Sequence, residues 1–480
     1  MPVYNAPERG AGASMPVRIR FDYENALEVR VGSEGLRPDA LNAKAGAAAV
    51  DAFRQRVQSG EVGFPTLPED TEVADAIAEF ANDLRPTIDD ILLLGIGGSA
   101  LGAYALDVAL RGPHPLQVTG PAAKKRSNRF QRGGPRLIVL DNVDPGPVAA
   151  ALALLNPKRT AVCVIAKSGS TAETLSTFLI VRGWMRKSLG RRARAQFIAI
   201  TDPEKGDLLQ IAREEKYSLF FIPSNVGGRF SVLSPVGLVP AALMGLDIHA
   251  LLRGARDINE LCWQRDPRRN PALASALVHH ALDRTKGKTM EVVFAYSSYL
   301  WGTAFWYRQL WAESLGKRFD RSGRIVHTGQ TPVAALGVTD QHSQLQLYME
   351  GPPDKMITFW AVEKPRAEVR IPKDLQQYDS CRYLGGKKLS ALFEAERVAT
   401  EAALTEAERP NCRWTLPQID EYNLGAFLQL LEFQTAFAGE LYGVNAFDQP
   451  GVELGKKLTY TLMGRKGYEE YAKKLRKSVT

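Results

Sequence analysis

Short runs of apolar residues recur along the middle of the chain, and segments with helical spacing separate them. The runs cover residues 90–94, 136–140, 162–165, 196–201 and 219–222. Each run is short and rich in branched side chains, as is typical of strands buried on both faces of a parallel sheet. Because strands alternate with helices, the pattern predicts a doubly wound α/β sheet.

A second α/β unit begins near Lys288 in the same pattern. Its strands are predicted at residues 290–296 and 355–362, with a helix of about 299–314 between them. Helical spacing also covers about residues 40–84, with an interruption at 60–68, and the C-terminal part at about 388–409 and 419–442. We therefore expect two parallel α/β units with helical segments before and after them.

The loop after the run 162–165 has the chemistry of an anion site. It reads Lys167-Ser168-Gly169-Ser170-Thr171, and Ser170 with Glu173 forms a capping box that predicts a helix start. A helix N-terminus offers unpaired N–H groups and partial positive charge, and the hydroxyls add donors, so phosphate is the expected anion. An ordinary capped turn explains the same residues equally well.

A second glycine-rich turn follows the run 90–94. Gly95, Gly97 and Ala100 satisfy a loose dinucleotide fingerprint, but the acidic residue that should bind the ribose about 20 positions later is missing. A nicotinamide dehydrogenase is therefore disfavoured. We interpret the turn as another phosphate loop, with Ser99 supplying a hydroxyl where the helix starts. Ser99 and Ser168 should meet at the carboxyl edge of the sheet.

Two charged residues suit catalysis. Gly227 and Gly228 allow a tight turn that presents Arg229, and a guanidinium so placed stabilises developing negative charge. The alternative is an arginine that only stabilises the turn.

Glu313 lies one turn after Gln309 in the last turn of the helix 299–314, near the negative end of the helix dipole. Apolar neighbours suggest partial burial, and both effects make Glu313 a better proton acceptor, as a general base requires. The alternative is a surface glutamate paired with Lys317.

Two further polar groups remain open in function. His342 lies in a predicted helix around 340–344 and is either catalytic or an ordinary residue of the first helical turn. The turn before the last helix holds a dense polar group of Asp448, Gln449, Glu453 and Lys456. Taken alone, this turn is more simply interpreted as a solvated loop.

The composition excludes several classes of protein. A net charge of +8 and a pI near 9.2 suit an acidic substrate, whereas the basic clusters at 124–126 and 191–194 are interpreted as solvated faces and not as a nucleic-acid site. The four scattered cysteines favour a reducing compartment and oppose a cysteine-built metal site. No signal peptide is visible in the Gly/Ala/Pro-rich tail at residues 1–14, and no apolar run approaches the ~20 residues of a membrane span.

Several motifs, in chain order, carry a resemblance to one family. They read GIGGSALG (95–102), AKSGSTAET (166–174), GGRFSVLSPVGL (227–238), ESLGK (313–317), DQHSQ (340–344) and FDQPGVELGK (447–456). Together they resemble the glucose-6-phosphate isomerase family from about residue 89 to the C-terminus. The resemblance implies sugar isomerase (SIS) domains at 85–245 and 246–410. A tail and helical segment at 1–84 would precede them, and a helical arm at 411–480 would follow.

The resemblance also implies a reaction, the reversible isomerisation of glucose 6-phosphate and fructose 6-phosphate through a cis-enediol. Glu313 would move the proton between C1 and C2, and Arg229 would stabilise the charge of the intermediate. His342 and Lys456 would serve ring opening, with His342 reaching in from the partner subunit of a homodimer. The residues that would contact the phosphate and the sugar are Gly98, Ser99, Lys167, Ser168, Thr171, Gln309 and Gln449.

The resemblance implies no metal and no cofactor, and a cytoplasmic enzyme. The family commonly has Ser where this chain has Ala166, so we expect weaker phosphate affinity or a compensating water. Two alternatives stay open. A non-catalytic SIS sensor would bind a sugar phosphate but would have no reason to hold Glu313, His342 and Lys456 together. A dual phosphoglucose/phosphomannose isomerase would share the reaction, but such chains are typically much shorter.

Overall fold

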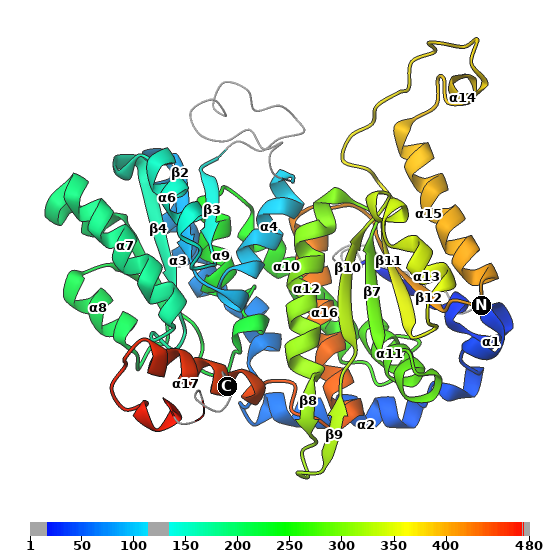
Figure 1. Ribbon diagram of the computed structural model, residues 1–480, viewed down its shortest axis with the longest axis horizontal. Coiled ribbons are helices and arrows are strands. Elements are labelled where there is room, and N and C mark those ends of the chain that lie inside the picture. The colour runs from blue at the N-terminus through cyan, green and yellow to red at the C-terminus, as the bar shows by residue number, and fades with distance from the viewer. Residues whose placement is uncertain (1–16, 114–133, 473, 475–480) are drawn as a thin grey trace, which may run out of the picture.

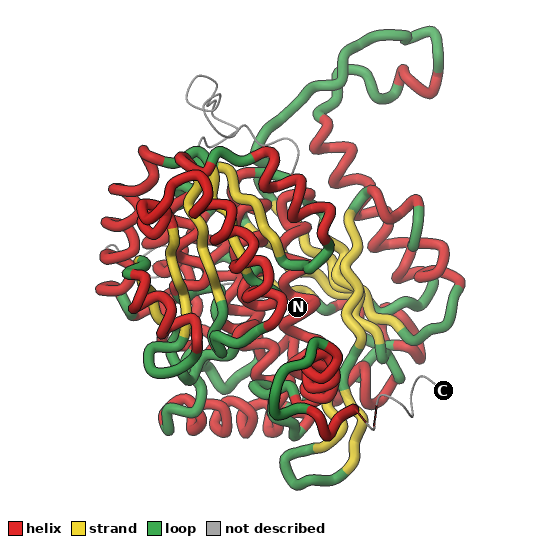
Figure 2. Tube along the Cα trace, turned by 60° about the vertical axis from the view of Figure 1, so that its left-hand side comes forward, coloured by secondary structure: helices red, strands yellow, loops and turns green. Residues whose placement is uncertain are grey.

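The computed structural model describes residues 17–113, 134–472 and 474. Within them, two five-stranded sheets lie side by side with helices packed on both faces (Figures 1 and 2). The tail at 1–14 and the basic cluster at 124–126 fall outside these ranges, whereas Arg191, Arg192 and Arg194 are exposed, as predicted. None of the helices in the described ranges is long and apolar enough to cross a bilayer.

The first sheet confirms the predicted doubly wound parallel arrangement. Its order is β3-β2-β4-β5-β6, and every neighbouring pair is parallel. The observed strands, which match the predicted runs to within two residues at each end, are β2 (Asp90–Leu94), β3 (Arg136–Leu140), β4 (Thr160–Ile165), β5 (Phe197–Thr201) and β6 (Ser218–Phe221).

Alternate side chains of the first sheet enter two different hydrophobic clusters. Leu92 and Val164 pack with α6 (Pro145–Leu154), α7 (Ala172–Leu189) and α8 (Asp207–Glu215). Ile91 and Ile165 belong to the main core on the opposite face. That face is covered by α4 (Leu101–Arg111) and α9 (Pro235–Leu243), and α3 (Thr71–Leu84) packs on α9.

The second sheet has the order β1-β12-β11-β7-β10, in which β1 is antiparallel and the others are parallel. One face packs on α13 (Leu345–Glu350) and α15 (Leu389–Glu406). The strands are β1 (Arg20–Asp22), β7 (Met290–Ala295), β10 (Thr331–Leu336), β11 (Lys355–Val362) and β12 (Asn411–Leu416). The predicted strand 355–362 is confirmed, and 290–296 is one residue too long.

The opposite face of the second sheet adjoins the main core. Here α16 (Glu421–Tyr442), which is buried over nearly its whole length, packs against α10 (Ile248–Cys262), α11 (Pro271–Lys286) and α12 (Trp301–Leu315). The remaining helices and the hairpin are α1 (Glu28–Val31), α2 (Ala43–Gln58), α14 (Asp379–Arg382), α17 (Glu453–Leu462), β8 (Lys317–Phe319) and β9 (Ile325–Thr328).

Three strands of the second sheet, β1, β10 and β12, were missed in the sequence. The segment 411–480 was expected to be a helical arm. That segment begins as β12, so a boundary at 411 would separate β12 from its neighbour β11. Cys412, Trp414 and Leu416 are buried while the residues between them are half-buried. This alternation spans only a few residues and includes an arginine, so it resembled a loop between two helices. β1, at Arg20–Asp22, is too short for a recognisable period.

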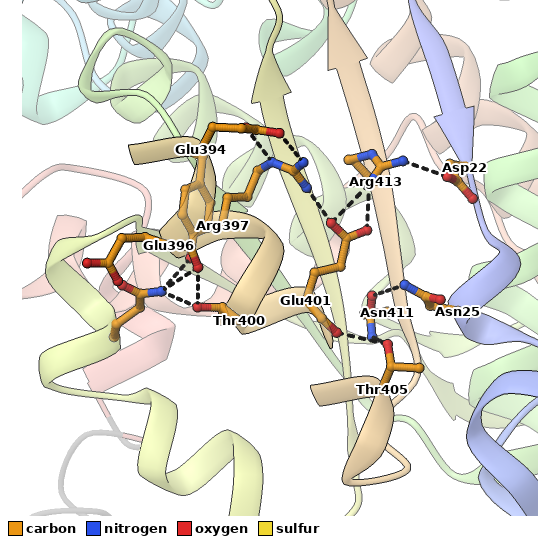
Figure 3. Close-up of polar contacts among 12 residues, drawn as sticks. Asp22, Asn25, Glu394, Glu396, Arg397, Thr400, Glu401, Thr405, Asn411 and Arg413 are labelled. Atoms are coloured by element: carbon orange, nitrogen blue, oxygen red, sulfur yellow. Dashed lines mark hydrogen bonds and ion pairs between the residues drawn. The ribbon is translucent and has the colours of Figure 1, made fainter. Parts of the chain in front are cut away.

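A polar network fixes β1 and β12 to α15 (Figure 3). Arg413 on β12 donates to Glu401 at 2.8 Å and to Asp22 on β1 at 2.7 Å. Arg397 donates to the same Glu401 from one turn earlier in α15. Nearby, Asn25 donates to Asn411 at 3.2 Å. The antiparallel edge strand is therefore held by a partly buried charge pair as well as by its backbone.

Candidate functional site

Two loops at the carboxyl edge of the first sheet hold the predicted phosphate residues. After β4, the hydroxyl oxygens of Ser168 and Thr171 lie 3.3 Å apart, and the Ser170 backbone N–H points to the Ser168 hydroxyl at 3.3 Å. The predicted capping box is wrong: Thr171 is the N-cap of α7, and no side chain accepts a capping hydrogen bond there. The hydroxyl oxygens instead gather at the helix start, where backbone N–H groups are unpaired.

Lys167 is not held among these hydroxyls. Its ammonium donates to the carbonyl oxygens of Ser224 and Val226, at 2.7 and 2.8 Å. Burial lowers the pKa of Lys167. In this structure the side chain therefore connects the phosphate loop to the segment that leads into Arg229.

The glycines of the two turns allow their backbones to touch. A β-carbon added to Gly98, in the 3₁₀ turn Gly97–Ser99, would lie 2.3 Å from the carbonyl carbon of Gly228. Gly97 has φ +57°, and a β-carbon there would lie 2.7 Å from the amide nitrogen of Gln309. Ser99 and Arg229 thus sit on turns that are in direct contact.

Arg229 connects three parts of the chain. It is only 3% exposed and lies in the 3₁₀ turn Gly228–Phe230. Its guanidinium donates to Glu313 Oε2 at 3.2 Å, to Gln449 Oε1 at 3.0 Å and to the hydroxyl of Ser314 at 2.8 Å. Further bonds go to the carbonyl oxygens of Ala446 and Asp448. Burial lowers the pKa of Arg229, and the carboxylate of Glu313 opposes that effect.

The carboxylate of Glu313 is held on both sides. Arg229 contacts one oxygen, and the amide of Gln309, one turn earlier in α12, donates to the other at 3.0 Å. The side chain keeps 35% of its surface exposed, so a ligand can reach it. The alternative pairing with Lys317 is not observed, because Lys317 donates to the backbone carbonyl of Glu313. Four predicted site residues, Gln309, Glu313, Arg229 and Gln449, therefore form one connected group.

Lys456 lies on α17, which follows the segment that contains Gln449. Its ammonium pairs with Glu453 at 2.8 Å, and both side chains are about half exposed. α17 contains no buried residue, and the hydroxyl of Tyr460 reaches the Ser170 carbonyl at 3.4 Å. Figure 1 shows α17 lying across the lower end of the first sheet, beside α7 and α8. The helix that carries Lys456 is thus placed over the phosphate loop.

His342 lies elsewhere in the same chain. The predicted helix 340–344 is a 3₁₀ turn, Thr339–His342, which follows β10 at the carboxyl edge of the second sheet. β7 ends at that edge and leads into the start of α12, whereas Glu313 is near the end of α12. The two residues are therefore separated by almost the length of α12, about 20 Å at 1.5 Å per residue.

Sequence reasoning missed the residues that hold this group from behind. Ser314 and Lys317 were visible in the ESLGK motif, but Ser314 was given no role and Lys317 was considered only as an ion-pair partner of Glu313. The carbonyl oxygens of residues 444–448 were also missed, because backbone acceptors leave no signal in a side-chain pattern.

Comparisons with known proteins agree with this geometry. A family model described as "Phosphoglucose isomerase" matches residues 63–473. A glucose-6-phosphate isomerase from Carboxydothermus hydrogenoformans is 45% identical and covers 94% of this chain and 96% of its own. One from Rubrobacter xylanophilus is 43% identical and covers 94% of this chain and 99% of its own.

A solved structure has the same fold. The crystal structure of a hypothetical protein from Thermus thermophilus has a TM-score of 0.81 at 39% identity, and the match covers 93% of this chain and all of the other. The family match spans most of the chain and includes every predicted site residue. This chain belongs to the phosphoglucose isomerase family.

Proposed function

We propose that the protein interconverts glucose 6-phosphate and fructose 6-phosphate, the reaction that the names of its relatives describe. One observation carries the proposal. The carboxylate of Glu313 is held between Gln309 and the buried guanidinium of Arg229, at the edge of the sheet that also presents the phosphate loops. Aldose–ketose exchange needs this combination of a base and a fixed cation.

In the proposed reaction, Glu313 removes the proton from C2 of the open-chain aldose. The electron pair of the broken C–H bond forms the C1–C2 double bond, and the π pair of the C1 carbonyl moves onto O1. The hydroxyl proton on O2 passes to O1, so the intermediate is a cis-enediol in which negative charge is shared by the two oxygens. Glu313 then returns its proton to C1 as the C2–O bond becomes the ketone carbonyl. The guanidinium of Arg229 would stabilise the oxygen charge, because five protein acceptors already fix its orientation and little reorganisation is needed.

The phosphate would bind at the start of α7. Ser168 and Thr171 offer hydroxyls there, and the first turn of α7 adds N–H groups. Ser99 would approach from the turn after β2, because β2 is the neighbour of β4 in the sheet. Lys167 would act mainly through the carbonyls that it holds, with its positive charge close to the site. Gln309 and Gln449 would line the sugar, because both reach the Glu313–Arg229 pair.

Ring opening would use Lys456 from α17 and a histidine from a second subunit. His342 follows β10 at the sheet edge where α12 starts, whereas Glu313 is near the end of α12. One chain therefore does not supply both residues to one site. A homodimer in which the partner's His342 completes the site would resolve this separation. The segment 363–388 also favours a partner: it extends away from the body in Figure 1, contains no buried residue, and exposes Val369, Leu375 and Tyr378.

The first test is turnover of fructose 6-phosphate to glucose 6-phosphate in the presence of EDTA, with mannose 6-phosphate assayed in parallel. Activity on fructose 6-phosphate alone is expected. Comparable activity on mannose 6-phosphate would favour a dual phosphoglucose/phosphomannose isomerase. Binding of the sugar phosphate without turnover would refute the proposal and indicate a sensor.

The shared site can be tested by mixing two inactive variants after unfolding and refolding them together. Glu313→Gln and His342→Gln should restore activity, because each mixed dimer contains one site free of both changes. At equal amounts about one quarter of the sites should be intact. Glu313→Gln mixed with Arg229→Met is the control. Both changes then affect residues of one chain's own site, so every site carries a lesion and no activity should return.

A further inference from the structure

Lys317 is a buried lysine whose ammonium contacts the backbone of two segments of the site. It follows α12 and begins β8, and its side chain is only 6% exposed. The ammonium donates to the backbone carbonyl of Glu313 at 2.6 Å and to that of Asp448 at 2.6 Å. The Asp448 carboxylate lies 3.3 Å away. One buried cation thus joins the last turn of α12 to the segment that contains Gln449.

That segment, residues 443–449, is held by several cations from separate elements. Arg229 donates to the carbonyl oxygens of Ala446 and Asp448, and Arg321 donates to that of Val444 at 3.2 Å. The side chain of Arg56, from α2, donates to Asn445 at 2.8 Å. Carbonyl groups that point at cations in this way fix the path of a loop without any regular secondary structure.

A simpler explanation is that Lys317 only completes a helix end. Basic side chains commonly bond the last carbonyls of a helix and stabilise it, and the bond to the Glu313 carbonyl fits that description. Two facts go beyond it. The same ammonium has a second carbonyl partner across the site, at Asp448. In addition, Arg229 makes a parallel connection between the same two segments, through the Glu313 carboxylate and the Asp448 carbonyl.

We propose that Lys317 is a positioning residue of the active site. It holds the last turn of α12 in register with the segment 443–449, so that Glu313, Arg229 and Gln449 keep their mutual geometry. The inference rests on the proposed function, since it assigns Lys317 a role in that reaction, but the contact itself is independent of the chemistry. Lys317 would touch no substrate and would act through the backbone of Glu313 and Asp448.

The effect should fall on the rate. A displacement of about 1 Å between a base and its substrate costs roughly a hundredfold in turnover, whereas the phosphate loops after β2 and β4 are held by other contacts. Loss of Lys317 should therefore lower kcat much more than it raises KM. Burial lowers the pKa of Lys317, and the positive charge of Arg229 adds to that effect. The negative charges of Asp448 and Glu313 oppose it.

The test compares Lys317→Met with Lys355→Met. Lys355 is also 6% exposed and also bonds a backbone carbonyl, of Pro352, and an adjacent carboxylate, of Asp354, but it lies at the start of β11. We expect Lys317→Met to lower kcat by about 10- to 100-fold with KM changed less than threefold, and Lys355→Met to leave both constants within twofold. Lys317→Arg, which keeps the charge and the donors, should recover most of the rate.

Hydrogen exchange supplies a readout that does not depend on turnover. Lys317→Met should speed amide exchange in 443–449 relative to wild type, and Lys355→Met should not. If the wild type proves inactive, the proposed function fails, and the exchange result still decides whether Lys317 holds the segment. An unchanged kcat in Lys317→Met, or an equal loss in both variants, would overturn the inference. If Lys317→Met does not fold, Lys317→Gln takes its place with the same expected results.

Discussion

A glutamate inside the helical core gives the sharpest prediction about stability. Glu432 lies on α16 and is fully buried, and neither carboxyl oxygen has a hydrogen-bond partner within the described ranges. Burial raises the pKa of Glu432 well above its usual value of 4.5. The folded protein therefore keeps a proton on this carboxyl at a pH where the unfolded chain has released it.

The sign of the effect follows from proton binding. Above pH 4.5 the unfolded state binds fewer protons at this group than the folded state, so the free energy of unfolding falls as the pH rises. The loss is about 1.4 kcal/mol for each pH unit, and it continues until the pH reaches the raised pKa of the folded state. Glu432→Gln resembles the protonated acid in shape and does not titrate, so it removes this loss.

The assay is urea unfolding of both proteins between pH 5.5 and 7.5. The stability advantage of Glu432→Gln should grow with pH, by up to roughly 2.7 kcal/mol over these two units. Glu260→Gln, an exposed change of the same kind on the neighbouring helix α10, should show no such trend. Parallel stability curves for Glu432→Gln and wild type would show that the carboxyl is ionised or solvated in the folded state, and the reasoning would be wrong.

Three other predictions concern the site. Glu313→Gln should keep the fold by circular dichroism but lose more than about a hundredfold in kcat, as for other positioned general bases; a loss within tenfold would remove Glu313 as the base. Ala166→Ser should lower KM for the sugar phosphate about tenfold or more, since a hydrogen bond to a charged group contributes roughly 1.5–3 kcal/mol; an unchanged KM would contradict this. Gly98→Ala should force the turn after β2 away from the turn of Arg229 and lower kcat, because the added β-carbon would lie 2.3 Å from the carbonyl carbon of Gly228. Gly183→Ala on α7 is the control and should stay fully active, because its β-carbon would meet no atom within 4 Å.

The sequence predicted those parts of the fold that depend on continuous burial. The strands β2, β4, β5, β7 and β11 are buried over almost their whole length and leave a clear signal. β3 and β6 are only partly buried but are still mostly apolar. β12 has an arginine at its centre, at position 413, which needs Glu401 and Asp22 as partners. Glu401 is 12 positions away on another element and Asp22 is 391 positions away, so local pattern alone does not reveal that the charge is satisfied inside a sheet.

The same limit applies to the site. Motif order brought Glu313, Arg229, Gln309 and Gln449 together, and the structure places them in one hydrogen-bonded group. The direction of a long side chain was less predictable. Lys167 was expected to face the phosphate but donates to two carbonyls of a neighbouring loop, because a flexible ammonium takes whichever acceptors the fold presents.

The edge strand β1 has a consequence for the order in which the chain is made. Asp22 and its partner Arg413 are 391 positions apart. At 5–20 residues per second, a ribosome needs roughly 20–80 s to travel that distance. The first sheet ends with β6 at Phe221, so it is fully synthesised in the meantime. During this interval β1 has no strand to join, and the second sheet acquires this edge only after β12 has been made.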